Sequence, residues 1–127
     1  MFAGIRHKFY LLTLRLMAPL MPGSTHVAFV GSESTRQLCQ HIAILAPNKV
    51  LIVTDKPLRD LGIADRAVAG LVDAGVACAW YDGVQPDPTY KELEEGLAIL
   101  KAEGCDVVLA VGGGSAMDCA KIIAACA

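Results

Sequence analysis

Charged side chains are scarce in this sequence. Lys, Arg, Asp and Glu together make up only 19% of the 127 residues, and the formal net charge is −2. Such a chain lacks the basic surface that nucleic-acid binding requires. Apolar residues make up 54% of the sequence, which excludes an intrinsically disordered protein. The length suits one domain with a modest hydrophobic core.

Histidine is also rare, and cysteine shows no metal-binding spacing. The three histidines, His7, His26 and His41, form no recognised ligand motif. The five cysteines contain no CxxC pair; they are Cys39, Cys78, Cys105, Cys119 and Cys126. Their mostly apolar surroundings favour the buried, reduced thiols of a cytoplasmic protein over disulfides or a zinc site. No nucleophile–base pair is visible, so the sequence offers no candidate catalytic residue and no metal ligand.

No apolar run is long enough to span a bilayer. The run at residues 9–17 follows a basic start, as in a secretory signal, but Arg15 interrupts it and no small-residue cleavage site follows. Apolar residues recur at helical spacing between residues 5 and 16, which predicts a basic amphipathic helix within an extension over residues 1–22. We expect this helix to pack on its own domain or on a partner subunit rather than on a membrane surface.

The remaining residues, 23–127, alternate between predicted strands and helices. Strands are expected at residues 26–30, 49–53, 76–81 and 105–111. Helices are expected at residues 35–45, 61–74 and 90–103, the last with a capping box of Thr89 and Glu92, and again from the end of the last strand onward. Short strands joined by helices imply right-handed crossovers and a mostly parallel, Rossmann-like α/β sheet with flanking helices.

Three consecutive glycines at positions 112–114 separate the last predicted strand from the last helix. We expect Ser115 to be the N-cap of this helix and Asp118 to lie in its first turn. Glycines let a backbone approach a ligand closely, and the free N–H groups of a helix N-terminus favour an anion such as phosphate. The stretch matches neither common phosphate-loop pattern, because Met117 stands where a glycine is required and no lysine follows the glycines. A glycine-rich turn without a ligand is the alternative.

Ligands of parallel sheets bind at the carboxyl ends of the strands, which nominates three loops, at residues 54–55, 84–88 and 112–115. Asp55 directly follows an apolar strand. An acid there can accept hydrogen bonds from both hydroxyls of an adenosine ribose and would repel a 2′-phosphate. The alternative role for Asp55 is that of a helix N-cap or a turn residue.

Three stretches in the right order carry a resemblance to a known family. GGGSAMDCAK, at residues 112–121, resembles the GGGSxxDxxK motif of the iron-containing (group III) alcohol dehydrogenases. LIVTDKPL, at residues 51–58, is similar to the strand of that family that ends in Thr-Asp-Lys. YDGVQPDPT, at residues 81–89, is similar to its Asp-Gly-Val-x-Pro-Asn-Pro-Thr segment. The similarity runs from about His26 to the C-terminus, and the lactaldehyde reductase and short-chain alcohol dehydrogenase branch looks most alike.

This resemblance implies an NAD-dependent oxidoreductase acting on a small alcohol or aldehyde. It implies that Gly114 and Ser115 hold the pyrophosphate and that Asp118 lies near the nicotinamide. Asp87 stands where the family usually has Asn, so it keeps a hydrogen-bond acceptor but lacks the amide donor. The cofactor-binding residues implied in this way are Asp55, Asp87, Gly112, Gly113, Gly114, Ser115 and Asp118.

The resemblance also implies a divalent metal, iron or zinc, held by an Asp and three His residues of a later helical domain. We therefore expect this chain to be the N-terminal cofactor-binding part of a longer, homodimeric enzyme, and to have no turnover alone. Two alternatives stay open. One is the N-terminal domain of a dehydroquinate synthase-like lyase, against which the Asp-Gly-Val-x-Pro-x-Pro stretch argues. The other is a non-catalytic nucleotide-binding module that is complete as it stands.

Overall fold

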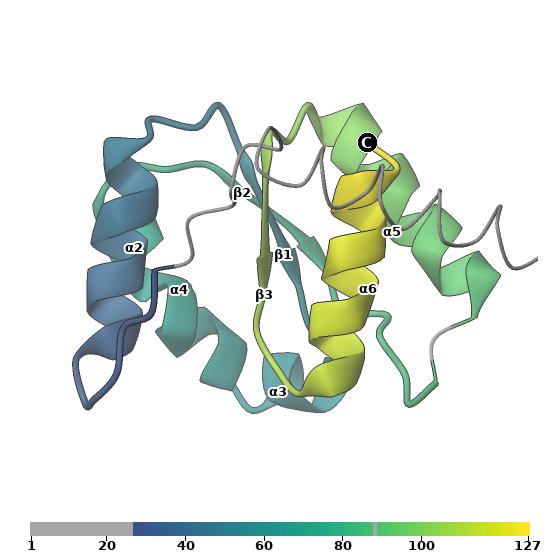
Figure 1. The fold of residues 1–127 in the computed structure, drawn as a ribbon, viewed down its shortest axis with the longest axis horizontal. Helices are drawn as coiled ribbons and strands as arrows, with labels where there is room; N and C mark the ends of the chain where they lie inside the picture. Colours follow the sequence, from purple (N-terminus) through teal and green to yellow (C-terminus); the bar gives the residue numbers. More distant parts are fainter. Residues whose placement is uncertain (1–26, 88) are drawn as a thin grey trace, which may run out of the picture.

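The computed structural model of the chain describes residues 27–87 and 89–127 (Figure 1). The helix predicted within residues 1–22, and the proposed domain boundary beside it, lie outside these residues. No helix within the described ranges is long and apolar enough to cross a membrane.

A three-stranded parallel sheet forms the centre of the fold. Its strands are β1 (Val50–Val53), β2 (Cys78–Tyr81) and β3 (Val107–Ala110), in the order β2-β1-β3. In the sheet register, Val50 lies opposite Cys78 on one side and Val107 on the other. All four residues of β1 are buried, as expected for the central strand of a sheet that is covered on both faces. The parallel α/β sheet predicted from the sequence is thus confirmed.

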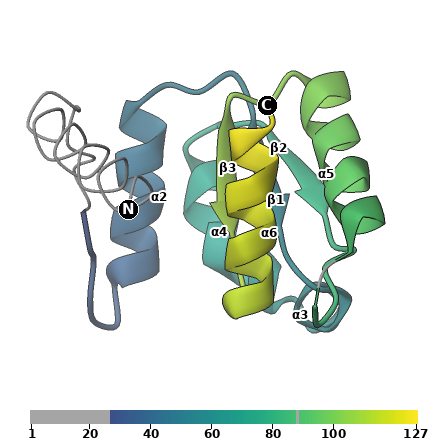
Figure 2. The ribbon, with the colours of Figure 1, turned by 45° about the vertical axis from the view of Figure 1, so that its right-hand side comes forward.

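Helices cover both faces of the sheet (Figures 1 and 2). One face carries α2 (Ser34–Ile44) and α4 (Ile63–Asp73), and the other carries α5 (Tyr90–Glu103) and α6 (Gly114–Ala125). The short helix α3 (Lys56–Asp60) follows β1.

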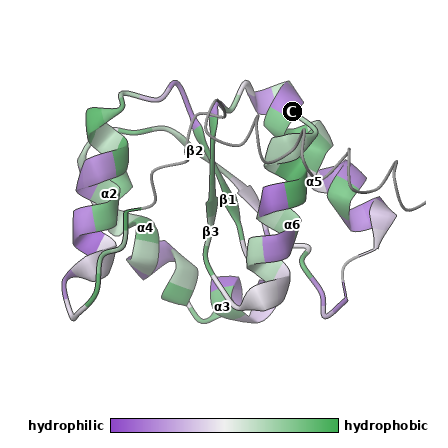
Figure 3. Ribbon diagram, in the orientation of Figure 1, coloured by the Kyte–Doolittle hydropathy of each residue, from purple (hydrophilic) through white to green (hydrophobic). Residues whose placement is uncertain are grey.

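Side chains of β1 alternate between two hydrophobic cores. Val50 and Ile52 pack with the α2 and α4 side, whereas Leu51 and Val53 pack with the α5 and α6 side. Figure 3 shows hydrophobic strands between helices of mixed hydropathy, the pattern of helices that bury one face.

Local sequence signals explain most of the helix ends. At the start of α5, the Thr89 N–H donates to Glu92 Oε2 at 2.6 Å within the predicted capping box. Gly104 ends this helix with φ 64°, the left-handed conformation that glycine adopts most readily. The helix predicted at residues 61–74 is observed as α4, and Gly62, with φ 67°, separates it from α3.

Three local predictions are wrong. Residues 27–30 form no strand, and Val30 is 92% exposed, because no strand within the described residues pairs with them. Ser115 is not the N-cap of α6, because the extended backbone of Gly113 already provides the cap and the helix begins at Gly114. This earlier start also places Asp118 beyond the first turn, which contains no acidic residue.

Candidate functional site

The three loops nominated by the strand-end rule meet at one cavity of about 140 Å³. Each loop follows a different strand of the sheet, so the cavity lies at the carboxyl ends of β1, β2 and β3. Its lining residues are Asp55, Val84, Gln85, Pro86, Gly113, Gly114, Ser115 and Ala116.

Backbone hydrogen bonds hold these loops in register at the end of the sheet. The Val111 N–H donates to the Val53 carbonyl at 2.9 Å, which extends the pairing of β3 with β1 as far as the glycine loop. The Thr54 N–H donates to the Tyr81 carbonyl at 2.9 Å, and Asp55 forms an isolated antiparallel bridge with Gly83. The cavity is therefore built on the rigid sheet rather than on free loops.

Only one of the three loop glycines is required by the backbone. Gly112 has φ 150°, and a Cβ there would lie 3.0 Å from Ala116 Cβ and 3.8 Å from Asp55 Oδ2. Gly113 and Gly114 have no positive φ, and a Cβ on either would meet no protein atom within 4 Å. The space beside Gly113 and Gly114 is left open by the protein itself.

The N-terminus of α6 opens onto this space without a side-chain cap. The first helical hydrogen bond runs from the Met117 N–H to the Gly113 carbonyl at 3.1 Å. The N–H groups of Gly114, Ser115 and Ala116 precede it and make no hydrogen bond within the described part of the chain. Free N–H groups at the positive end of a helix of this length fit a phosphate or pyrophosphate.

Asp55 uses its two carboxylate oxygens differently. Oδ1 accepts a hydrogen bond from the Leu58 N–H at 2.9 Å and so caps α3, which confirms the helix-cap alternative. Oδ2 lies on the side of Gly112. Asp55 is half-buried, which leaves it accessible to a ligand. The cap and a ligand contact are therefore compatible.

The structure does not bring every predicted cofactor residue to the cavity. Asp55, Gly113, Gly114 and Ser115 line it, and Gly112 shapes the loop behind them. Asp87 is exposed, has φ 56° and is not among the lining residues. Asp118 of α6 does not line the cavity either. Its side chain is exposed and accepts a hydrogen bond from Lys121 Nζ at 3.2 Å.

Val84, Gln85 and Pro86 form the wall after β2 and belong to the nominated loop at residues 84–88, although none of them was assigned a role. Ala116, which completes the start of α6, lies outside the nominated loops, and an alanine carries no chemical signal that could have identified it. A second cavity, of about 480 Å³, shares Asp55 and the wall after β2 and extends toward Lys56, Pro57, Asp82 and Gly83.

Two buried hydroxyls near the end of the sheet make no hydrogen bond within the described residues, namely Thr54 Oγ1 and Tyr81 OH. Burial raises the pKa of the Tyr81 hydroxyl, with a smaller contribution from Cys119 and nearby acids, so Tyr81 stays protonated near neutral pH. Burial likewise raises the pKa of the Cys39, Cys78 and Cys119 thiols. These thiols are therefore poor nucleophiles.

Residues 27–87 and 89–127 contain no group of three or more His, Cys, Asp or Glu side chains placed to hold a metal ion. The described residues therefore do not fit the metal that the resemblance implies, and no chemical step through a metal is derived from them.

The fold and its glycine loop define an α/β domain of the Rossmann-like class. Residues 25–127 match the family model of the iron-containing alcohol dehydrogenases, and the chain belongs to this family.

Known relatives agree with this assignment. The 1,3-propanediol dehydrogenase of Klebsiella pneumoniae is 36% identical over 112 residues, which cover 87% of this chain and 28% of the relative. The lactaldehyde reductase of Escherichia coli strain K12 is 38% identical over 96 residues, which cover 76% of this chain and 25% of the relative. The crystal structure of the NADH-dependent butanol dehydrogenase A of Thermotoga maritima superposes with a TM-score of 0.70 at 29% identity, and covers 82% of this chain and 27% of that one. The chain thus spans about a quarter of the length of the relatives it matches.

Proposed function

We propose that this chain forms the NAD-binding part of a metal-dependent alcohol dehydrogenase or aldehyde reductase. The observation that carries the proposal is the start of α6, which no side chain caps and whose free N–H groups open onto the same cavity as Asp55. A dinucleotide needs both features, because its pyrophosphate is an anion and its ribose offers two hydroxyl donors. The NADH dependence stated in the name of the Thermotoga maritima relative supports this choice of cofactor.

Each part of the cavity has a proposed role in binding. The N–H groups of Gly114, Ser115 and Ala116 donate to the pyrophosphate, and the Ser115 hydroxyl adds a further donor. The Asp55 carboxylate accepts from the adenosine ribose while it continues to cap α3. Bound NAD would supply the hydride acceptor of an alcohol oxidation, and this chain's contribution is to hold and orient the cofactor.

The remaining parts of the activity are proposed from family membership. The divalent metal and the pocket for a small alcohol or aldehyde are proposed to lie in the three quarters of the family length that this chain does not match. The full-length enzyme is proposed to be a cytoplasmic homodimer, and this chain alone is proposed to have no turnover. Free thiols, of which Cys39, Cys105 and Cys119 are buried, fit a reducing compartment.

Gly114→Val tests the pyrophosphate role. A valine side chain there would enter the space left open beside the loop and displace phosphate oxygens, whereas the protein itself offers no clash. We expect NAD binding to be nearly abolished while circular dichroism shows an unchanged fold. Ser115→Ala, which removes one hydroxyl and no backbone donor, should weaken binding only modestly.

Isothermal titration of NAD into each variant provides the measurement. Met117→Val is the matched control, because Met117 is exposed on the same helix and does not line the cavity. It should bind NAD as the unaltered chain does. Unchanged NAD affinity in a folded Gly114→Val would show that the loop is a structural turn.

A further inference from the structure

The short helix α3 carries Asp55 as its N-cap and directly follows the site end of β1. None of its five residues is buried. A helix of this length is not stable by itself in water, because it closes too few hydrogen bonds to offset the ordering of its backbone. The position of the Asp55 carboxylate therefore depends on the contacts that hold α3 against its neighbours.

Leu58 places α3 against both parts of the candidate site. Its N–H donates to Asp55 Oδ1 at 2.9 Å. Its Cδ1 lies 3.5 Å from the place that a Cβ on Gly112 would occupy at the start of the glycine loop. A shift or rotation of α3 would therefore move the Asp55 carboxylate relative to the loop that is proposed to hold the pyrophosphate.

Arg59 connects α3 to two other elements of the fold. Its guanidinium carbon lies 3.5 Å from the centroid of the Trp80 ring in β2, and its Nη1 donates a hydrogen bond to Asp65 Oδ1 of α4. A guanidinium is planar, so it can stack on an aromatic ring and pair with a carboxylate at the same time. The other charged residues of α3, Lys56 and Asp60, pair with each other inside the helix, and this pair does not fix its position.

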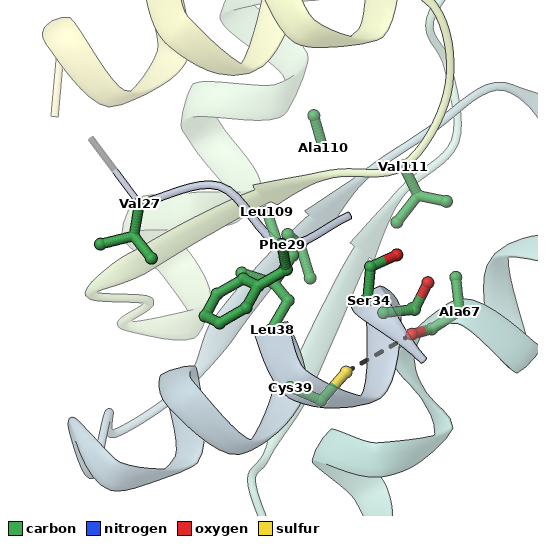
Figure 4. A pocket seen from close by; sticks show the side chains of 10 residues that line it. Val27, Phe29, Ser34, Leu38, Cys39, Ala67, Leu109, Ala110 and Val111 are labelled. Carbon is green, nitrogen blue, oxygen red and sulfur yellow. Dashed lines mark hydrogen bonds between the residues drawn. The ribbon is translucent and has the colours of Figure 1, made fainter. Parts of the chain in front are cut away.

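The two partners of Arg59 are themselves held in place. Trp80 is part of strand β2 and packs against the hydrophobic core beneath α2 and α4. Asp65 lies in the first turn of α4. That helix is joined to α2 by a hydrogen bond from Cys39 Sγ to the Ala67 carbonyl at 3.4 Å (Figure 4). Arg59 therefore links the small, exposed helix α3 to the packed part of the domain.

We propose that Arg59 is a positioning residue for the recognition of the adenosine ribose, and that it acts through Asp55. The stack on Trp80 and the ion pair with Asp65 hold α3, and α3 holds the carboxylate of its N-cap. Arg59 lines neither of the two cavities that Asp55 lines, so its effect on a ligand there has to pass through α3. The inference rests on the proposed function, because the ribose contact of Asp55 is part of that function.

Arg59→Ala removes both contacts and leaves Asp55 in the sequence. We expect it to weaken NAD binding about fivefold, because the ribose acceptor is no longer held in one orientation. NADP carries a phosphate on one of the two ribose hydroxyls, so its affinity should change by less than about twofold. A merely structural role for Arg59 would weaken both cofactors alike. Arg59→Lys, which keeps the charge but not the stack, should bind NAD with intermediate affinity.

Arg66→Ala is the matched control, because Arg66 is exposed on α4 and forms no ion pair within the described residues. It removes the same charge and should leave both affinities unchanged. A second comparison places Arg59→Ala in an Asp55→Gly background, where the ribose acceptor is already absent. There the substitution should have no further effect on NAD affinity.

Isothermal titration of each cofactor, with circular dichroism as a check of folding, measures these affinities. Hydrogen exchange of the Leu58 amide reports the Asp55 cap without any cofactor, and Arg59→Ala should speed this exchange about fivefold.

Four results would each overturn the inference while Asp55→Gly still weakens NAD and so supports the proposed function. They are an NAD affinity that Arg59→Ala leaves unchanged, an equal loss for NAD and NADP, a further loss in the Asp55→Gly background, and unchanged exchange of the Leu58 amide. If the unaltered chain bound no NAD, the proposed function would fail, and the inference would fail with it.

Discussion

At the candidate site, the Asp55 carboxylate caps a helix, and in the proposed function it also selects the cofactor. Asp55 Oδ1 caps α3 through the Leu58 N–H, so the side chain is already held in one orientation before any ligand binds. Preorganisation of this kind lowers the entropy cost of a ligand contact. If Asp55 binds the adenosine ribose as proposed, its negative charge would also repel the 2′-phosphate of NADP.

Asp55→Asn removes the negative charge of the side chain but keeps an oxygen that can cap α3. The amide oxygen keeps the acceptor for the Leu58 N–H, so the free energy of unfolding should change by less than about 1 kcal/mol. Loss of the charge should shift the ratio of NADP to NAD affinity toward NADP by about tenfold, which corresponds to about 1.4 kcal/mol.

Titration of both cofactors into the unaltered chain and the variant measures that ratio. Asp55→Gly, which also removes the ribose acceptor, should weaken NAD further and favour NADP in the same direction. A ratio that stays constant in both variants would contradict the ribose role and leave Asp55 as a helix cap.

At the scale of elements, a buried glycine allows α5 to pack closely against α6 and β2. Gly96 lies in the middle of α5, and a Cβ there would clash with Ile123 Cδ1 of α6 and lie 3.1 Å from Tyr81 Cδ1 of β2. Gly96 has no positive φ, so the requirement comes from packing and not from backbone conformation.

Gly96→Ala should therefore destabilise the fold by about 1–3 kcal/mol through overpacking. This result is opposite in sign to helix propensity, which alone would favour alanine by about 1 kcal/mol. Ile123→Val removes the clashing Cδ1, so the double variant should recover part of the loss. Urea unfolding of the two single variants and the double variant measures the coupling, and a gain in stability from Gly96→Ala alone would refute the packing argument.

The sequence predicted those elements that are specified by residues close to one another along the chain. The apolar runs of β1 and β3, the capping box of α5 and the glycine after it all act within a few residues, and each is observed. The strand expected at residues 26–30 failed over its described residues because a strand depends on a partner that a local pattern cannot supply. The start of α6 was displaced because the extended backbone of Gly113 replaced the expected Ser115 cap.

The candidate site, too, was predicted from the sequence only in part. The loops were predicted because the carboxyl ends of parallel strands share one edge of the sheet. The alignment of Asp55 beside Gly112, and the absence of Asp87 from the cavity wall, depend on loop conformation that no residue pattern specifies.

Across the whole molecule, backbone hydrogen bonds join the strands at both ends of the sheet, and a carboxylate adds to them at the end opposite the site. There the Asp106 N–H donates to the Lys49 carbonyl at 3.1 Å, and the Asp106 carboxylate lies just before β3. Asp106 accepts hydrogen bonds from the Asn48 N–H at 3.0 Å, from Asn48 Nδ2 at 3.1 Å and from the Lys49 N–H at 3.3 Å. These contacts tie the entry of β1 to the entry of β3 and so fix the relative position of the two strands whose far ends carry Asp55 and the glycine loop.

This arrangement predicts how stability depends on pH. The Asn48 N–H, followed by the Lys49 N–H, lowers the pKa of Asp106 below its ordinary value, although partial desolvation opposes the shift. The folded state therefore binds this proton less readily than the unfolded state does. The stabilisation from Asp106 is present in full above the unfolded pKa of about 4 and is lost as the pH falls through the lower folded value.

Asp106→Asn removes the titration, and urea unfolding at a series of pH values measures its effect. The unaltered chain should exceed the variant in stability by a constant amount above about pH 5, and this difference should shrink as the pH falls below about 4. If the difference between the unaltered chain and Asp106→Asn stayed constant down to acidic pH, the carboxylate would add nothing to the backbone pairing of β1 with β3. The alignment of the two site loops would then depend on the strand ladder alone.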